Sequence, residues 1–205
     1  MTITAILEYD KRRVLVQMDE HLTFPLYKNE LIKFNIEEGK ELSQAVYTEL
    51  VGTVLSKRIK LRAMNLLMKR SYTREGLRRK LAEGKYPDFL IEEALNYVTS
   101  YRYLDDMRYA EEYIRCYSES RSKLRIMQDL HAKGIERELA EQAWASYEAL
   151  NAPIDEVAQI EALLQKKHYD RKTADRKETA RMMNFLYRKG YSMDNIIHCT
   201  KMEEF

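Results

Sequence analysis

Basic side chains at helical spacing are the residues whose types and positions most clearly point to a chemical role. Arg70, Arg74 and Arg78 recur every four residues, and Arg79 and Lys80 lie beside them. Two further groups repeat this spacing farther along the chain. Their members are Arg121, Lys123, Arg125, Arg176, Lys177 and Arg181. Because guanidinium and ammonium groups pair with phosphates and carboxylates, these side chains predict contact with nucleic-acid phosphates or with a carboxylate-rich protein groove.

Catalytic and metal-binding patterns are missing from the sequence. The four histidines show no HxxxH or HExxH spacing, and no GxSxG nucleophile motif occurs. The adjacent carboxylates of Asp105 and Asp106 are better explained by capping of a helix than by catalysis. Cys116 and Cys199 form no CxxC pair, and we expect Cys116 to be a buried thiol on a helix. The sequence therefore predicts a protein that is not an enzyme and needs no metal or cofactor.

Composition predicts a helical, globular chain. Of its 205 residues 45% are hydrophobic and 33% charged, with only six glycines and three prolines to form turns. The formal net charge is only +2, so an interaction with nucleic acid must depend on local charge. Residues 1–9 do not resemble a signal peptide, and no apolar run approaches the ~18 residues of a membrane span. We expect a monomer in the reducing cytoplasm that does not enter a membrane.

The first part of the chain has the alternation of a β-hairpin. Apolar residues alternate in 3–7 and again in 14–18, and residues 9–12 form a polar turn between them. Residues 22–26 predict a short third strand, which Pro25 restricts to an edge. A short helix is expected over 28–34, and Ser43 is expected to cap a longer one.

From about Leu61 onward the apolar period is helical and repeats three times. Each repeat has three apolar anchors separated by four and then five residues, with a glycine between the last two. The anchors are Leu77, Leu81 and Tyr86, then Ile126, Leu130 and Ile135, then Met182, Leu186 and Tyr191, and the glycines are Gly84, Gly134 and Gly190. We expect each glycine to end its middle helix in a left-handed turn. Pro153 is expected in the first turn of a helix, and Ser192 as the cap of the last one.

These patterns predict a mainly α fold. Three tandem three-helix repeats would form an elongated curved array, because a unit this small buries too little surface alone and neighbours should stack. A small N-terminal β-hairpin and helix segment precedes them. The expected boundaries are 1–57 for this segment and 58–106, 107–152 and 153–205 for the three repeats.

Charge alternates in phase with the repeat. Residues 57–85 hold eleven Lys and Arg against two Asp and Glu, whereas residues 86–120 hold three against eight. The later stretches continue the pattern. Basic residues number four against one acidic residue in 121–134, one against seven in 135–161 and nine against three in 162–190. First and middle helices are thus expected to be basic and last helices acidic. Stacked units would then present one positive and one negative stripe. Separated charges of this kind mainly affect the steering and the choice of binding partners. A solvated surface with weak internal salt bridges is the alternative.

Several motifs make the chain similar to the RecX family of bacterial regulatory proteins. The first repeat carries Arg70-Ser71-Tyr72-Thr73-Arg74-Glu75 and closes with Tyr103-Leu104-Asp105-Asp106, followed by Tyr109-Ala110; the later repeats carry Lys133-Gly134-Ile135 and Phe185-Leu186-Tyr187-Arg188-Lys189-Gly190-Tyr191-Ser192. The likeness covers roughly residue 12 to the C-terminus. The sequence departs from the family at Gly76, where a carboxylate is usual, and at Tyr101-Arg102, which replaces a usual glycine.

This resemblance implies a non-enzymatic modulator of the RecA recombinase. Proteins of the family bind RecA filaments on single-stranded DNA and limit their growth, which lowers RecA activities in recombination, DNA repair and the SOS response. The expected partners are therefore RecA and its filament, with direct contact to DNA left open. A stand-alone DNA-binding protein that acts without RecA is the alternative, and an acidic partner other than RecA is a third interpretation.

Overall fold

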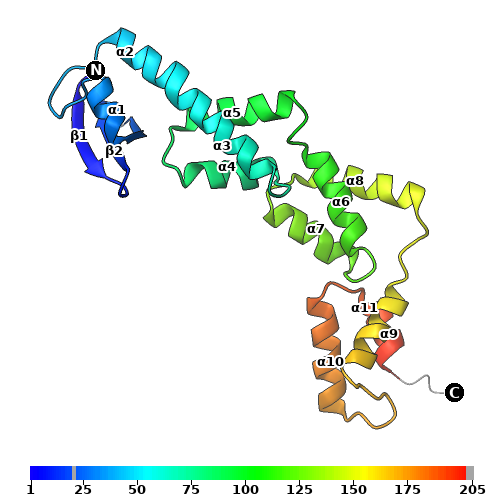
Figure 1. The fold of residues 1–205 in the computed structure, drawn as a ribbon. Helices are drawn as coiled ribbons and strands as arrows, with labels where there is room; N and C mark the ends of the chain where they lie inside the picture. The colour runs from blue at the N-terminus through cyan, green and yellow to red at the C-terminus, as the bar shows by residue number, and fades with distance from the viewer. Residues whose placement is uncertain (20–21, 202–205) are drawn as a thin grey trace. The chain divides into compact units, whose positions relative to one another are not determined.

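The computed structural model describes residues 1–19 and 22–201. The chain divides into two compact units (Figure 1), of which the first runs from Met1 to Asp105 and the second begins at Asp106. Each unit has its own packed interior.

The first unit opens with a three-stranded antiparallel sheet. Its strands are β1 (Ile3–Glu8), β2 (Arg13–Met18) and β3 (Thr23–Tyr27), in the order β1-β2-β3. The turn between β1 and β2 is held by Asp10, whose Oδ1 accepts hydrogen bonds from the backbone N–H groups of Arg12 and Arg13 at 2.9 and 2.8 Å. The predicted hairpin is therefore confirmed, and β3 with its proline is an edge strand as expected.

One run of helical backbone connects the sheet to the first helix bundle. After the short helix α1 (Lys28–Lys33), α2 (Gln44–Glu49) continues through a π-helical turn at Leu50–Leu55 into α3 (Ser56–Leu67). Ser43 caps α2 as predicted, because its Oγ accepts a hydrogen bond from the Val46 N–H at 3.3 Å. Position 57, where the sequence analysis divides the chain, lies within α3.

Helical hairpins form the rest of both units. Their helices are α4 (Arg74–Ala82), α5 (Asp88–Ser100), α6 (Asp106–Tyr117), α7 (Lys123–Ala132), α8 (Arg137–Leu150), α9 (Glu156–Lys166), α10 (Arg176–Arg188) and α11 (Met193–Thr200). In the first unit, a single hydrophobic core extends from the sheet through α3, α4 and α5. The second unit has two cores, one within α6–α8 and its flanking loops and one within α9–α11 and theirs. The mainly helical fold with a small sheet is thus confirmed.

The repeated apolar anchors form these cores. Eight of the nine predicted anchors are buried, and the remaining one, Met182, is partly buried against the third core. Leu81, Leu130 and Leu186 occupy equivalent places in their bundles and are completely buried. The four-then-five spacing therefore identifies the inward face of each middle helix correctly.

Two of the three glycines predicted to end a middle helix in a left-handed turn do so. Gly134 and Gly190 have φ values of +84° and +86°, as expected for glycines that end α7 and α10. In the first bundle the left-handed residue is Lys85, with φ +58°, and the prediction for Gly84 is wrong. The reason is position: the left-handed residue directly precedes the third anchor, and Gly84 stands two residues before Tyr86.

Three further predictions need correction. Pro153 precedes α9, which begins at Glu156 with Asp155 as its cap. Cys116 is exposed, because α6 buries the face that carries Ala110 and Ile114. The same helix is also not basic, since it has two arginines against three acidic residues. Ser192 caps α11 as predicted.

Candidate anion-binding surfaces

The predicted cations of the first unit lie on α4 and, for Arg70, before it. Thr73 caps α4, because its side chain accepts a hydrogen bond from the Gly76 N–H at 2.9 Å. Arg74 donates to Glu92 and to Asn96 on α5, both at 2.9 Å. Arg78 pairs with the same Glu92 and lies 3.5 Å from Glu75. The predicted row is therefore on one helix only from Arg74 onward, because Arg70 lies in the turn before α4, and Glu92 on α5 pairs with two of its members.

The other cations of this group also have local partners. Arg79 lies 3.2 Å from Glu75, and Lys80 lies 2.8 Å from Glu83. The guanidinium of Arg70 lies 4.5 Å from the centre of the Tyr72 ring. Pairs this exposed contribute little to stability, so an external anion can compete for the arginines at small cost.

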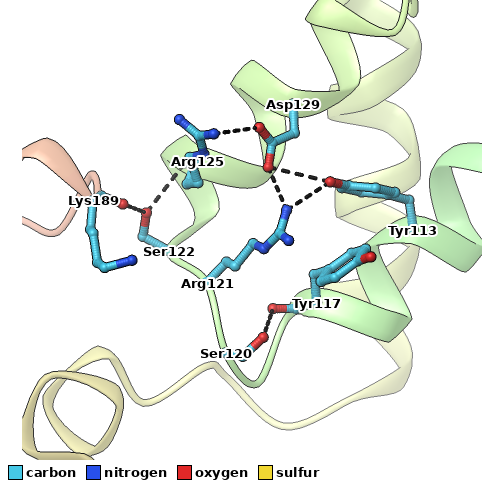
Figure 2. A network of polar contacts seen from close by, with 8 residues as sticks. All are labelled: Tyr113, Tyr117, Ser120, Arg121, Ser122, Arg125, Asp129 and Lys189. Carbon is cyan, nitrogen blue, oxygen red and sulfur yellow. Dashed lines mark hydrogen bonds and ion pairs between the residues drawn. The ribbon is translucent and has the colours of Figure 1, made fainter. Parts of the chain in front are cut away.

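In the second unit, a polar network surrounds Asp129 on α7 (Figure 2). Arg121 donates from Nη1 to Asp129 Oδ2 at 2.7 Å and to Tyr113 Oη at 2.8 Å. Arg125 lies one helical turn before Asp129, and its Nη2 is 3.1 Å from Asp129 Oδ1. The Arg121 guanidinium also lies 3.9 Å from the centre of the Tyr117 ring. One carboxylate, only 15% exposed, thus holds two predicted arginines in fixed positions.

Electrostatics keeps this network in one protonation state. Burial raises the pKa of the Tyr113 hydroxyl, and the Asp129 charge raises it further. Burial acts against the charged form of Arg121, but Tyr113 and Asp129 outweigh it and raise the arginine pKa. Arg121 therefore remains a cation and Tyr113 a neutral donor at physiological pH.

A hollow of about 390 Å³ opens beside this network. One side is lined by Ser120 and Arg121 from the loop before α7 and by Arg125 from its first turn. The other side is lined by Arg188 at the end of α10 and by Lys189 and Tyr191 after it. Arg188 and Lys189 were not among the predicted site residues. They end a helix next to a glycine, and the signals that could have indicated them are the basic stretch and the family motif in which they lie.

The two sides of the hollow are joined by a buried serine. Ser122 Oγ donates to the Lys189 carbonyl at 2.7 Å and accepts from the Arg125 N–H at 3.2 Å (Figure 2). Gly190 makes this approach possible, because a Cβ there would lie 2.7 Å from Ser122 Oγ. The left-handed glycine therefore positions two basic side chains as well as ending a helix.

The remaining predicted cations lie elsewhere in the second unit. Lys123 lies 4.9 Å from the centre of the Trp144 ring and 3.5 Å from Glu148, both on α8. Arg176, Lys177 and Arg181 are exposed on the first half of α10. At 1.5 Å per residue, Arg176 is about 18 Å along the helix from Arg188. The structure brings Arg121 and Arg125 together but leaves the α10 group apart from them. A stripe shared by all three bundles stays a prediction.

Residues 1–19 and 22–201 do not meet the requirements of a three-ligand metal site or of a membrane-spanning helix. No group of three or more His, Cys, Asp or Glu side chains could hold a metal ion there. No helix in this part of the chain is long and apolar enough to cross a membrane.

Comparisons with known proteins give the class of protein. Two family descriptions match the second unit: "RecX, second three-helix domain" over residues 105–143 and "RecX, third three-helix domain" over residues 154–199. Two solved structures share the fold. "Crystal structure of regulatory protein RecX" covers 97% of this chain and 98% of its own, with a TM-score of 0.64 and 22% identity. "Crystal structure of RecX from Lactobacillus salivarius" covers 71% and 96%, with a TM-score of 0.57 and 24% identity. The chain is thus a helical-repeat protein built from RecX-type three-helix domains.

Sequence relatives give the family itself. "Regulatory protein RecX" of Vibrio parahaemolyticus is 34% identical over 145 residues, which are 69% of this chain and 89% of that protein. The protein of the same name from Caldanaerobacter subterraneus is 26% identical over 198 residues, 96% of either chain. The chain belongs to the RecX family of regulatory proteins.

Proposed function

We propose that this chain is a non-enzymatic regulator that binds RecA and its filament on single-stranded DNA. By binding, it limits filament growth and lowers RecA activities in recombination, DNA repair and the SOS response. Membership of a family named for regulation, and the RecA role that the sequence resemblance implies, are what carry this proposal.

The arrangement of α4 agrees with such a role. Arg74 and Arg78 share Glu92, and Arg78 and Arg79 share Glu75. Exposed ion pairs of this kind are weak, so an anionic partner can compete for the arginines without refolding of the chain. Residues 57–85 have a net charge of +9, from eleven basic and two acidic residues.

Inhibition of the RecA ATPase on single-stranded DNA tests the proposal. Charge reversal on α4 would place new carboxylates beside Glu75 and Glu92, so we choose the neutral variant Arg74→Gln/Arg78→Gln. We expect the wild-type chain to inhibit the ATPase and this variant to need a severalfold higher concentration for the same inhibition. The matched control is Arg12→Gln/Arg137→Gln, which removes the same charge at two exposed positions.

Two results would contradict the proposal. A wild-type chain that leaves the ATPase unchanged removes the regulatory role. Equal inhibition by the α4 variant and the control, with folds shown intact by circular dichroism, removes α4 from the interface. A protein that acts on DNA without RecA is the second candidate, and the hollow lined by Arg121, Arg125, Arg188 and Lys189 favours it. It would bind naked DNA with a steep salt dependence but leave RecA unbound.

A further inference from the structure

We propose that the hollow between α7 and the end of α10 binds phosphate groups of a nucleic-acid strand. This proposal deepens the proposed function. It rests on that function in so far as the bound strand is the DNA of a RecA filament. The site is defined by Arg121, Arg125, Arg188 and Lys189, and we call it the basic hollow.

Charge is the first argument. Four cations line the basic hollow, and none of the described residues that line it is a carboxylate. Two carboxylates act nearby: Asp129 pairs with Arg121 and Arg125, and Glu156 adds to the effect of burial in raising the pKa of Tyr191. The four cations outnumber these two carboxylates, so the hollow keeps a positive charge. The α7 N-terminus and the α10 C-terminus both end near the hollow and carry opposite partial charges, so the side chains determine its sign. Such a cluster is stabilised by bound anions.

Two of the three arginines, Arg121 and Arg125, are held in place before a ligand arrives. Arg121 is fixed by Asp129, Tyr113 and the Tyr117 ring, yet its contacts to Asp129 and Tyr113 both use Nη1. Arg125 contacts Asp129 through Nη2. Each guanidinium has five N–H donors in a planar fork, so several remain for an anion. Binding therefore requires little side-chain ordering, which favours affinity.

Size and lining favour a nucleic-acid strand over the alternatives. A volume of about 390 Å³ is within the range of small-ligand pockets, about 300–1,000 Å³, and admits a phosphate with the sugar attached to it. Protein partners prefer interfaces with apolar or aromatic centres, whereas protein–nucleic acid interfaces are more polar and strongly basic. The lining is five polar or charged residues and one buried tyrosine, Tyr191.

The test measures how tightly the full chain binds a labelled single-stranded oligonucleotide. Binding is monitored by fluorescence anisotropy at several salt concentrations. Arg125→Ala and Arg188→Ala each remove one contact. Arg188 is exposed at the end of α10 and makes no ion pair within residues 1–19 and 22–201, so its loss should leave the fold intact. Arg137→Ala is the matched control, because it removes an exposed arginine from α8.

We expect each hollow variant to bind the oligonucleotide about tenfold more weakly, as is typical for loss of a charged hydrogen bond. The slope of log K against log salt should fall by about 0.7 per lost contact on a single strand. The control should change neither quantity. No oligonucleotide binding by the wild-type chain at low salt, or hollow variants that bind like the control, would overturn the proposal.

Competitors identify the source of the anion. The proposal requires an unlabelled strand to displace the probe at far lower concentration than inorganic phosphate or poly-glutamate of equal charge. Displacement by either competitor as effectively as by the strand would assign the hollow to free phosphate or to an acidic protein instead. RecA binding is measured separately. If the hollow variants weaken oligonucleotide binding and RecA is not bound, the phosphate site is supported and the proposed function fails. If RecA is bound but the hollow variants bind the oligonucleotide like the control, the proposed function is supported and the phosphate site fails.

Discussion

Replacing Gly190 by alanine tests how the second unit builds its basic hollow. Two costs are expected. The backbone at φ +86° is left-handed, which costs an alanine roughly 1–2 kcal/mol. The new Cβ would also lie 2.7 Å from Ser122 Oγ and 3.2 Å from Leu124 Cβ, and overpacking of this kind costs about 1–3 kcal/mol. We therefore expect Gly190→Ala to lower the free energy of unfolding by about 2–5 kcal/mol.

Gly39 provides the matched control for this variant. Its φ is +79°, but a Cβ there would meet nothing within 4 Å, so Gly39→Ala has only the backbone cost of roughly 1–2 kcal/mol. Both variants are measured by urea denaturation followed by circular dichroism, and hydrogen exchange assigns each loss to its own unit. Gly190→Ala should also weaken oligonucleotide binding, because the turn that carries Arg188 and Lys189 must move.

A double-mutant cycle with Ser122→Ala isolates the steric part. Ser122→Ala removes the cap of α7 and leaves the Lys189 carbonyl without its hydroxyl donor, which costs about 1–3 kcal/mol. The hydroxyl that Gly190→Ala would displace is then already gone, so the double variant should lose less than the sum of the two single losses. Additive losses, or a Gly190→Ala variant no less stable than Gly39→Ala, would refute the close approach of the two segments.

Three further outcomes follow from the cores and the Asp129 network. Leu81→Ala and Leu130→Ala should each cost about 2–5 kcal/mol in urea denaturation, since both side chains are completely buried; a cost near zero would mean that the repeat alignment is wrong. In the native chain a thiol reagent should modify exposed Cys116 quickly and Cys199 only on unfolding, because burial raises the pKa of the Cys199 thiol; equal rates would contradict its burial. Because burial and then Asp129 raise the pKa of Tyr113, the folded state holds this proton more tightly than the unfolded state. Its stabilisation is therefore complete below pH about 10 and lost as the pH rises further, and Tyr113→Phe should show a smaller loss over that range.

The sequence predicts the fold well where the local pattern and the packing agree. Alternation over residues 3–18 specifies the hairpin, and the anchors at Leu81, Leu130 and Leu186 specify the inward faces of three helices. The glycine pattern alone fails at the end of α4, where the left-handed residue is set by its distance from the third anchor. Lys85 adopts the left-handed turn in spite of a neighbouring glycine, because the helix geometry places that turn one residue before Tyr86.

The candidate site shows the same division. Helical spacing identifies Arg121 and Arg125, which lie eight and four residues before one carboxylate, Asp129, and both pair with it. It does not find Arg188 and Lys189, which reach the hollow only through the approach of Ser122 to the α10–α11 turn, 67 residues away in sequence. Charge pairing between helices is likewise a tertiary property, and Glu92 on α5 takes two of the predicted cations.

Capture of RecA by the immobilised full chain tests the central claim most directly. The chain is incubated with RecA alone, with RecA and single-stranded DNA, and with RecA, single-stranded DNA and nucleotide. We expect RecA capture that is strongest when the filament has formed, and weaker capture by Arg74→Gln/Arg78→Gln than by Arg12→Gln/Arg137→Gln. Failure of the wild-type chain to retain RecA under all three conditions would contradict it.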